Sequence, residues 1–236
     1  MGFFSDLFKT NIDNTELALQ LFETQIVGSH TDKKYKYQVD KILKECTPTG
    51  KKYPERQQVL LKVIDLIGEP KNPKERFIIA KAYALSRVEY REKAIYYLEL
   101  YLNNELWKDS YVHIIHNHQD TPEISKLYHL NEMYTYLAKA YEGLYNFDKS
   151  LKCYEYLIEI FPEHPSAYRG KATILIKQNN LSICYDWLKT IKKSEYYKVY
   201  YRPTVLGTKL KDSWFKDTID ELFQDVKYKI EQRLYL

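Results

Sequence analysis

Apolar residues recur at intervals of three and four positions along most of the chain, which is the spacing of one face of an α-helix. The clearest case lies between residues 131 and 164, where two such faces follow one another. The first face holds Tyr134, Leu137, Ala138 and Tyr141, and the second holds Phe147, Leu151, Tyr154, Leu157 and Ile158. The segment 143–146 supplies a turn, while Pro162 and Pro165 end the second helix and begin the next element. The pattern predicts an antiparallel pair of helices.

The same scheme recurs 34 residues later, over residues 165–198. In this unit Tyr168, Ala172, Leu175, Cys184 and Leu188 stand where Tyr134, Ala138, Tyr141, Ser150 and Tyr154 stand in the first. A third unit over residues 73–104 carries Ile79, Ala80, Tyr83, Ala94, Leu98 and Tyr101 in a matching arrangement. Residues 105–130 form an insertion between the unit 73–104 and the unit 131–164.

These units resemble the tetratricopeptide repeat (TPR), whose signature is W-x2-L-G-x2-Y, then A-x3-F, then P. In residues 131–164 each departure keeps the size class, with Tyr134 for Trp, Ala138 for Gly, Ser150 for Ala and Tyr154 for Phe. The resemblance covers about half of the chain, and the pattern is also compatible with related helical-pair repeats. It implies an all-α fold, a right-handed superhelical α-solenoid of antiparallel helix pairs.

The remaining segments are predicted to be helices that flank this array. Residues 1–72 form an N-terminal helical region with helices over 15–27, 35–45 and 54–67; the part 35–67 is compatible with a degenerate repeat but matches no pattern. One long helix over 122–143 extends the unit 131–164 at its N-terminal end. Residues 199–236 hold a connector and a C-terminal capping helix over 212–234, and Arg202-Pro203 and Gly207 make the stretch 196–211 irregular.

Composition and charge narrow the class of protein. The chain has 236 residues, of which 44% are hydrophobic, 29% are charged and only 7 are Gly, as expected for an ordered, helix-rich protein. The net charge of +4 is too mild to argue for nucleic acid by itself. Cys46, Cys153 and Cys184 are odd in number and far apart, which predicts buried, reduced thiols and a cytoplasmic location.

The sequence predicts no signal peptide and no membrane-spanning segment. The apolar runs near the start are short and interrupted by charges, and no stretch approaches the roughly 20 apolar residues of a membrane span. Residues 1–9 are consistent with a terminal helix docked on the protein or with a membrane-surface anchor. The oligomeric state is left open.

The most chemistry-like cluster lies in the insertion and consists of His113, His116, His118 and Asp120. Imidazoles at close spacing can bind a transition metal, but this run lacks the E-x-x-H pairing of metallohydrolase helices. A polar end of a short helix is the favoured interpretation. We therefore expect no metal and no cofactor. Because no phosphate-binding Gly loop, nucleophile elbow or paired-carboxylate motif appears either, we also expect no catalytic activity.

The resemblance implies that the first helix of each pair lines a concave groove that holds a segment of a partner protein. The candidate groove residues are Lys74, Phe77, Lys81, Thr135, Lys139, Glu142, Arg169, Thr173 and Lys177. The preponderance of Lys and Arg favours an acidic segment or a free C-terminal carboxylate, although simple solvation of an open groove also explains it. The asparagines of the carboxylate clamp in chaperone-binding members are missing here, so chaperone binding is not predicted.

The expected function is thus a non-catalytic protein-interaction module or scaffold. The alternative is a nucleic-acid-binding or regulatory repeat protein, which would use basic and aromatic residues such as those of the segment 196–211.

Overall fold

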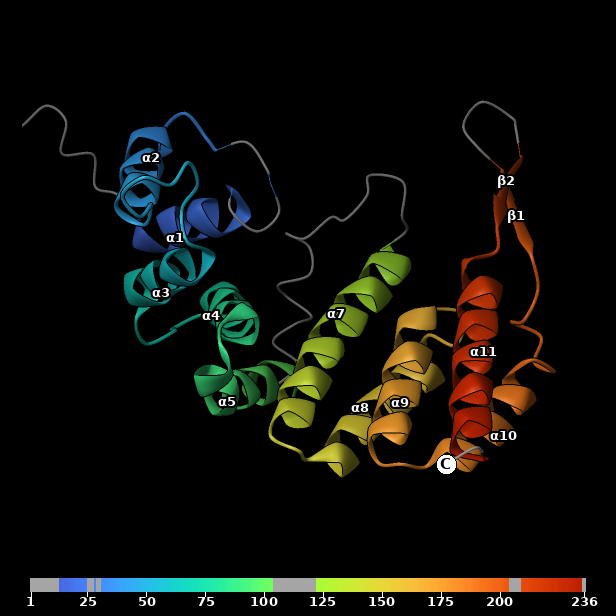
Figure 1. Cartoon of the computed structure of the whole chain (residues 1–236). Helices are drawn as coiled ribbons and strands as arrows, with labels where there is room; N and C mark the ends of the chain where they lie inside the picture. Colours follow the sequence, from blue (N-terminus) through green and yellow to red (C-terminus); the bar gives the residue numbers. More distant parts are fainter. Residues whose placement is uncertain (1–12, 25–27, 29–30, 104–121, 204–208, 235–236) are drawn as a thin grey trace, which may run out of the picture. The chain divides into compact units, whose positions relative to one another are not determined.

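The computed structural model describes residues 13–24, 28, 31–103, 122–203 and 209–234. Over these ranges the regular structure consists of α-helices joined by turns and loops, with one short 3-10 helix, two π-helical residues at 23–24 and one pair of short strands (Figure 1). The expected all-α class is therefore confirmed at this level. The chain divides into two compact units, residues 1–115 and residues 116–236. The predicted terminal helix over residues 1–9 and the histidine cluster of the insertion lie outside the described residues.

The first unit consists of helices whose ends follow local sequence signals. It holds α1 (Asn14–Phe22), α2 (Lys36–Glu45), α3 (Arg56–Ile67), α4 (Pro73–Leu85), the 3-10 helix η2 (Val88–Tyr90) and α5 (Arg91–Asn103). Asp13 caps α1 by accepting hydrogen bonds from the backbone N–H groups of Thr15 and Glu16. Gly68, at a φ of 63°, ends α3 in a conformation that disfavours residues with a Cβ. The helices predicted over 35–45 and 54–67 are confirmed, with small shifts at their ends. The helix predicted over 15–27 is observed as Asn14–Phe22, and residues 25–27 lie outside the described residues.

Helix α4 is the centre of the first unit, because it packs against α1, α3 and α5. Asn72 caps its start by accepting a hydrogen bond from the backbone N–H of Glu75, a residue that is only 8% exposed. Glu75 accepts hydrogen bonds from Thr15 Oγ1 at 2.7 Å and from the backbone N–H of Lys71 at 2.5 Å. One buried carboxylate thus joins α1, the turn before α4 and α4 itself.

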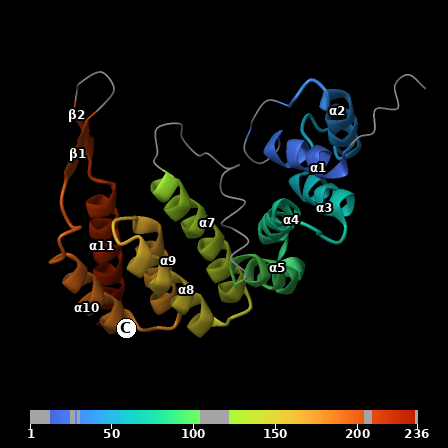
Figure 2. The same ribbon diagram turned by 180° about the vertical axis from the view of Figure 1, so that it is seen from behind.

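In the second unit each helix packs against the next along the chain. The elements are α7 (Pro122–Gly143), α8 (Phe147–Ile160), α9 (Pro165–Lys177), α10 (Leu181–Ile191), β1 (Tyr200–Pro203), β2 (Lys209–Asp212) and α11 (Trp214–Leu234). Figures 1 and 2 show α7, α9 and α11 lying alongside one another in this order, and α9 contacts both of the others. The long helix predicted over 122–143 is confirmed, as is the C-terminal helix, which begins two residues later than predicted.

The two turns of the second unit that join α7 to α8 and α9 to α10 have the same geometry. Tyr145 and Asn179 adopt left-handed conformations with φ of 59° and 68°. In each turn the following Asn donates its backbone N–H to a carbonyl five residues earlier, Asn146 to Tyr141 and Asn180 to Leu175, both at 2.9 Å. This is the bond pattern of a Schellman helix ending. The two copies lie 34 residues apart in the sequence.

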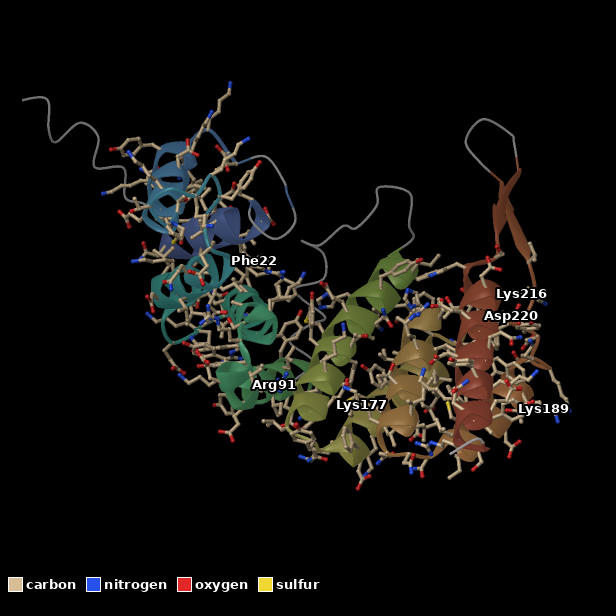
Figure 3. All side chains as sticks on the ribbon, in the orientation of Figure 1. Phe22, Arg91, Lys177, Lys189, Lys216 and Asp220 are labelled. Carbon is tan, nitrogen blue, oxygen red and sulfur yellow. The ribbon has the colours of Figure 1, made fainter. Side chains whose placement is uncertain are left out.

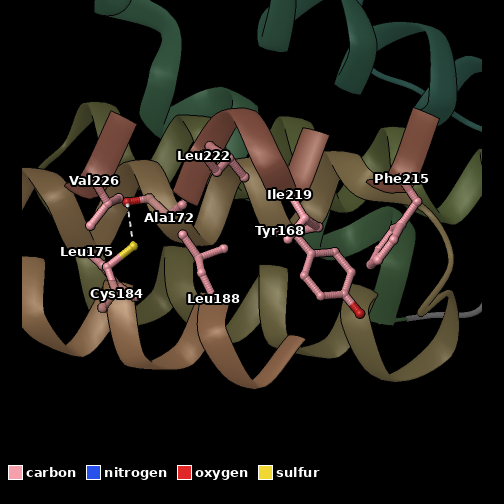
Figure 4. Close-up of a cluster of buried hydrophobic side chains, with 9 residues drawn as sticks. All are labelled: Tyr168, Ala172, Leu175, Cys184, Leu188, Phe215, Ile219, Leu222 and Val226. Atoms are coloured by element: carbon pink, nitrogen blue, oxygen red, sulfur yellow. Dashed lines mark hydrogen bonds between the residues drawn. The ribbon is translucent and has the colours of Figure 1, made fainter. Parts of the chain in front are cut away.

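One hydrophobic core cluster of the second unit lies between α9, α10 and α11 (Figure 4). Its members are Tyr168, Ala172, Leu175, Cys184, Leu188, Phe215, Ile219, Leu222 and Val226. The small residues Ala172 and Cys184 lie at the contact between α9 and α10, where the thiol approaches the carbonyl of Ala172 at 4.0 Å. The residues of α11 recur at three- and four-residue spacing, so one face of this helix covers the end of the α9–α10 pair.

A hairpin replaces the irregular connector that the sequence led us to expect. β1 and β2 pair antiparallel, with Tyr200 opposite Asp212 and Pro203 opposite Lys209. Pro203 is compatible with a strand here because it stands at the last pair of a two-stranded ladder, where a missing N–H is tolerated. The prediction was wrong because it weighed Pro and Gly as helix breakers without considering that tyrosines favour extended pairing.

The stretch before the hairpin is held on α11 by a single carboxylate. Asp220 accepts hydrogen bonds from Lys192 and Lys216 at 2.6 Å each and from the hydroxyl of Tyr197 at 2.5 Å. Figure 3 labels Asp220 and Lys216 one turn apart on α11. Burial alone would raise the pKa of Asp220, but these hydrogen bonds outweigh it and lower the pKa to about 2. The ionised carboxylate therefore acts as the anchor at neutral pH.

Candidate functional site

The second unit contains a cavity of about 380 Å³ that opens between α7, α9 and α11. Its lining comprises Thr135, Lys139 and Glu142 from α7, Tyr154 from α8, Pro165, Ser166, Arg169, Gly170 and Thr173 from α9, and Trp214 and Thr218 from α11. The predicted groove residues Thr135, Lys139, Glu142, Arg169 and Thr173 are thus brought together at one place. Their spacing on two parallel helical faces explains this, since α7 and α9 lie alongside one another.

Two of the predicted cations of this unit are already engaged by carboxylates of the same unit. Arg169 donates two hydrogen bonds to Glu221 of α11, at 3.2 and 2.8 Å. Lys177, labelled in Figure 3, forms an ion pair with Glu142 across α7 and α9. Both pairs are partly solvated, so each holds its cation only weakly. Their main effect is to cancel the charge of the groove at two points.

Lys139 differs from these cations. It lies on α7 with an exposed side chain and lines the cavity. Throughout the described ranges no carboxylate forms an ion pair with it, and no acceptor takes a hydrogen bond from it. Because Arg169 and Glu142 are each neutralised by a partner, the lining carries one uncompensated positive charge at Lys139.

Two hydroxyls of the cavity lining also have no hydrogen-bond partner among the described residues, the buried Oγ1 of Thr135 and the hydroxyl of Tyr154. The Tyr154 ring is buried between α8 and α9, at 2% exposure, and it lies directly on Gly170. A Cβ at Gly170 would stand 2.2 Å from both Cε1 and Cζ of the ring. Since Cζ carries the hydroxyl, the phenol oxygen emerges next to Gly170, which itself lines the cavity. No residue that the structure describes accepts or donates a hydrogen bond at this hydroxyl.

The surroundings of Tyr154 keep its proton in place. Burial, followed by the negative charge of Glu142, raises the pKa of this phenol above its ordinary value. Tyr154 therefore stays a neutral hydrogen-bond donor at any physiological pH. From the sequence we assigned Tyr154 to packing alone. The available signal was Gly170, a residue without a side chain in the middle of an otherwise ordinary helix.

An aromatic wall borders the cavity near the start of α9. Trp214 is 53% exposed and meets the ring of His164 edge-on, with 4.8 Å between the ring centroids. His164 Nδ1 lies 2.9 Å from the hydroxyl of Ser166, which donates in turn to Asn131 Oδ1 at 2.8 Å. Burial lowers the pKa of His164 to about 4, so this ring is neutral near pH 7.

The predicted groove residues of the first unit do not form a comparable site. Lys74 forms an ion pair with Glu16 at 2.7 Å. Phe77 and Lys81 are only 6% and 5% exposed. The Lys81 ammonium lies 5.7 Å from the ring centroid of Phe22 and 5.2 Å from that of Phe77. The expectation that Phe77 and Lys81 face an open groove was wrong, because α1 packs across this face of α4 and Phe22 covers it.

Three further features of the sequence can be compared with the structure, namely the cysteines, possible metal ligands and possible membrane-spanning helices. Cys46, Cys153 and Cys184 are free and buried, as expected, and burial raises the pKa of Cys184 to about 11. Within the described ranges no three His, Cys, Asp or Glu side chains gather as metal ligands would. The described helices also include none with the length and hydrophobicity that crossing a membrane requires.

Comparison of the chain with protein-family models, with curated proteins and with solved structures finds no match.

Proposed function

We propose that this chain is a TPR-like protein-interaction module, and that the cavity between α7, α9 and α11 binds an extended segment of a partner protein. Two observations support the repeat architecture. Each helix of the second unit packs on the next while α7, α9 and α11 lie alongside one another. The turns at Tyr145 and Asn179 have the same geometry at a spacing of 34 residues, which is the length of one repeat.

The observation that carries the binding function is the composition of the cavity wall. It combines an exposed tryptophan, an uncompensated lysine, an unengaged tyrosine hydroxyl and several smaller polar groups within about 380 Å³. Tryptophan and tyrosine are the residues that most often dominate binding energy at protein interfaces. We therefore infer a non-catalytic role, exercised in the cytoplasm, in which the groove selects a protein segment.

Nucleic acid is the alternative ligand, and the charges of the second unit favour it less. A nucleic-acid-binding face needs unpaired cations in a continuous row. Here Arg169, Lys177 and Lys171 are each paired with a glutamate. Protein is therefore the ligand we propose, with nucleic acid as an outcome of the test.

The proposal is tested by a substitution that fills the cavity, followed by a measurement of whether the protein still captures a partner. Thr173→Trp places an indole in the cavity, and Thr190→Trp on α10 is its matched control. Both threonines lie in helices and donate their hydroxyls to a backbone carbonyl of their own helix, Thr173 to Arg169 at 2.8 Å and Thr190 to Trp187 at 2.6 Å. The control therefore loses the same type of hydrogen bond, while its position is not part of the cavity lining.

The wild-type and variant proteins are tagged and first shown to have the same helicity and melting temperature. Each is then incubated with lysate of the cells in which the protein naturally occurs, and with the same lysate after nuclease treatment. We expect a protein that the wild type and Thr190→Trp capture and that Thr173→Trp loses. Capture that survives in Thr173→Trp would exclude the cavity as the binding site. Capture that nuclease abolishes would favour the nucleic-acid function instead.

A further inference from the structure

The lining of the cavity in the second unit carries one positive charge that no carboxylate neutralises among the described residues, and this charge indicates what the cavity binds. Of its charged lining residues, Arg169 is held by Glu221 and Glu142 is held by Lys177. Only Lys139 is left without a partner of opposite charge among the described residues. An uncharged ligand forms no ion pair with Lys139. A ligand with one negative charge does form one, and no existing ion pair has to break for it.

A hydrogen-bond donor in the cavity lining indicates the same chemistry. Tyr154 and Gly170 both line the cavity, and any other residue at position 170 would collide with the phenol ring at Cζ, the atom that carries the hydroxyl. Tyr154 is a donor that is held rigidly by burial and has no acceptor in the described part of the chain. A donor that is fixed in place and has no acceptor within the described part of the protein is available to a ligand that supplies one.

We propose that Lys139 and Tyr154 form a subsite for one carboxylate of the bound segment, opened by the absence of a side chain at Gly170. One carboxylate oxygen accepts from the Lys139 ammonium and the other from the Tyr154 hydroxyl. This inference rests on the proposed function and specifies its ligand. The proposal assigns one carboxylate rather than several, because Arg169, the other cation of the lining, is already paired with Glu221.

The carboxylate has two possible sources, an acidic side chain within the segment or the free end of a chain. Three short alanine-based peptides separate them. The first is capped at both ends and carries one aspartate, the second is its asparagine counterpart, and the third has no acidic side chain but a free C-terminal carboxylate. Each is titrated into the isotope-labelled full chain, and the backbone amide shifts of Lys139 and Gly170 are followed by NMR.

We expect the aspartate peptide, the free-carboxylate peptide or both to shift these amides. The asparagine peptide should bind about tenfold more weakly, which corresponds to the loss of one charge-assisted interaction. Lys139→Gln should abolish the preference for aspartate over asparagine. Lys152→Gln, an exposed lysine on α8 outside the cavity lining, should leave the preference intact. Tyr154→Phe, which keeps the ring and removes only the hydroxyl, should weaken carboxylate binding by about threefold to tenfold.

The subsite is overturned if the aspartate and asparagine peptides bind equally while the free-carboxylate peptide does not bind, or if no peptide shifts the amides of Lys139 and Gly170. This outcome is distinct from failure of the proposed function. If Thr173→Trp still loses a captured protein, the groove binds a partner without a carboxylate subsite. If the aspartate peptide binds at Lys139 but capture from lysate does not depend on the cavity, the subsite stands and the interaction function fails.

Discussion

Replacing Gly170 by alanine tests whether the ring of Tyr154 is locked against α9. The new Cβ would lie 2.2 Å from Cε1 and Cζ and 2.7 Å from Cδ1 of the ring. Carbon atoms pack best at about 3.5–4.0 Å, so the two groups must separate by more than an ångström. Tyr154 is 2% exposed and cannot move away without shifting α8 against α9.

Two opposing effects decide the magnitude. Alanine is favoured over glycine inside a helix by about 1 kcal/mol, which on an open surface would stabilise the protein. Overpacking a closed core costs about 1–3 kcal/mol, and a collision with a rigid aromatic ring belongs at the upper end of that range. The net expectation is a free energy of unfolding lower by about 2 kcal/mol, or a melting temperature lower by about 4–8 °C for a domain of this size.

Urea unfolding followed by circular dichroism measures this change, and a second variant assigns its cause. Tyr154→Ala alone should cost about 3–5 kcal/mol through the cavity that it leaves. In that background the ring is gone, so Gly170→Ala should become stabilising by about 1 kcal/mol. The change of sign is the diagnostic result. A Gly170→Ala protein as stable as the wild type would refute the locked ring, and with it the reason that the hydroxyl reaches the cavity.

Three further changes probe single groups. His164 has a pKa of about 4 in the folded protein and 6.5 in an unfolded chain, so its contribution to stability is complete above pH 6.5 and is lost as the pH falls to 4. The free energy of unfolding should fall by about 3 kcal/mol over this range. Unfolding measured between pH 6.5 and pH 4 should show this loss in the wild type and not in His164→Gln. Asp220→Asn removes the anchor of Lys192 and should cost about 1–2 kcal/mol, with faster amide exchange in the segment after α10. Glu75→Gln weakens the bonds that join Thr15 to α4 and should cost about 1–3 kcal/mol, seen as faster exchange in α1.

Each of these predictions has an outcome that contradicts it. The same loss of stability in wild type and His164→Gln between pH 6.5 and pH 4 would show that the ring is not the titrating group. Unchanged exchange after α10 in Asp220→Asn would mean that the hairpin and the core hold this segment without the carboxylate. If Glu75→Gln accelerated exchange equally in α1 and in the second unit, the effect would not be local to the α1–α4 contact.

Local signals made the helices predictable. The helix predicted over 122–143 is observed at Pro122–Gly143, because proline at the first position and an apolar face of regular period both act within the segment itself. The turn over residues 143–146 was equally predictable, since its residues interrupt the apolar period between the two helices. Half of the chain could be assigned in this way without any knowledge of which helices touch.

Long-range packing made other features unpredictable. Nothing near Lys81 shows that Phe22 covers it, because the contact joins two helices far apart in the sequence. Tyr154 was assigned to packing because its sequence position says only that the ring is buried. That the oxygen reaches a cavity depends on Gly170 of the next pair, which no helical period reveals. The placement of Lys139 in the cavity followed from helix geometry alone, but its lack of a partner required the positions of Glu142 and Glu221.

The repeated turn has a consequence for the speed of folding. Because Tyr145 and Asn179 reverse the chain within a few residues, most contacts of the second unit join helices that are neighbours along the sequence. Chains dominated by such local contacts fold in microseconds to milliseconds, since little loop entropy is lost before contacts form. The α7–α8 pair can form first and serve as the surface on which α9, α10 and α11 assemble in the order of synthesis. The groove, which needs α7, α9 and α11 together, is then the last part of the unit to be completed.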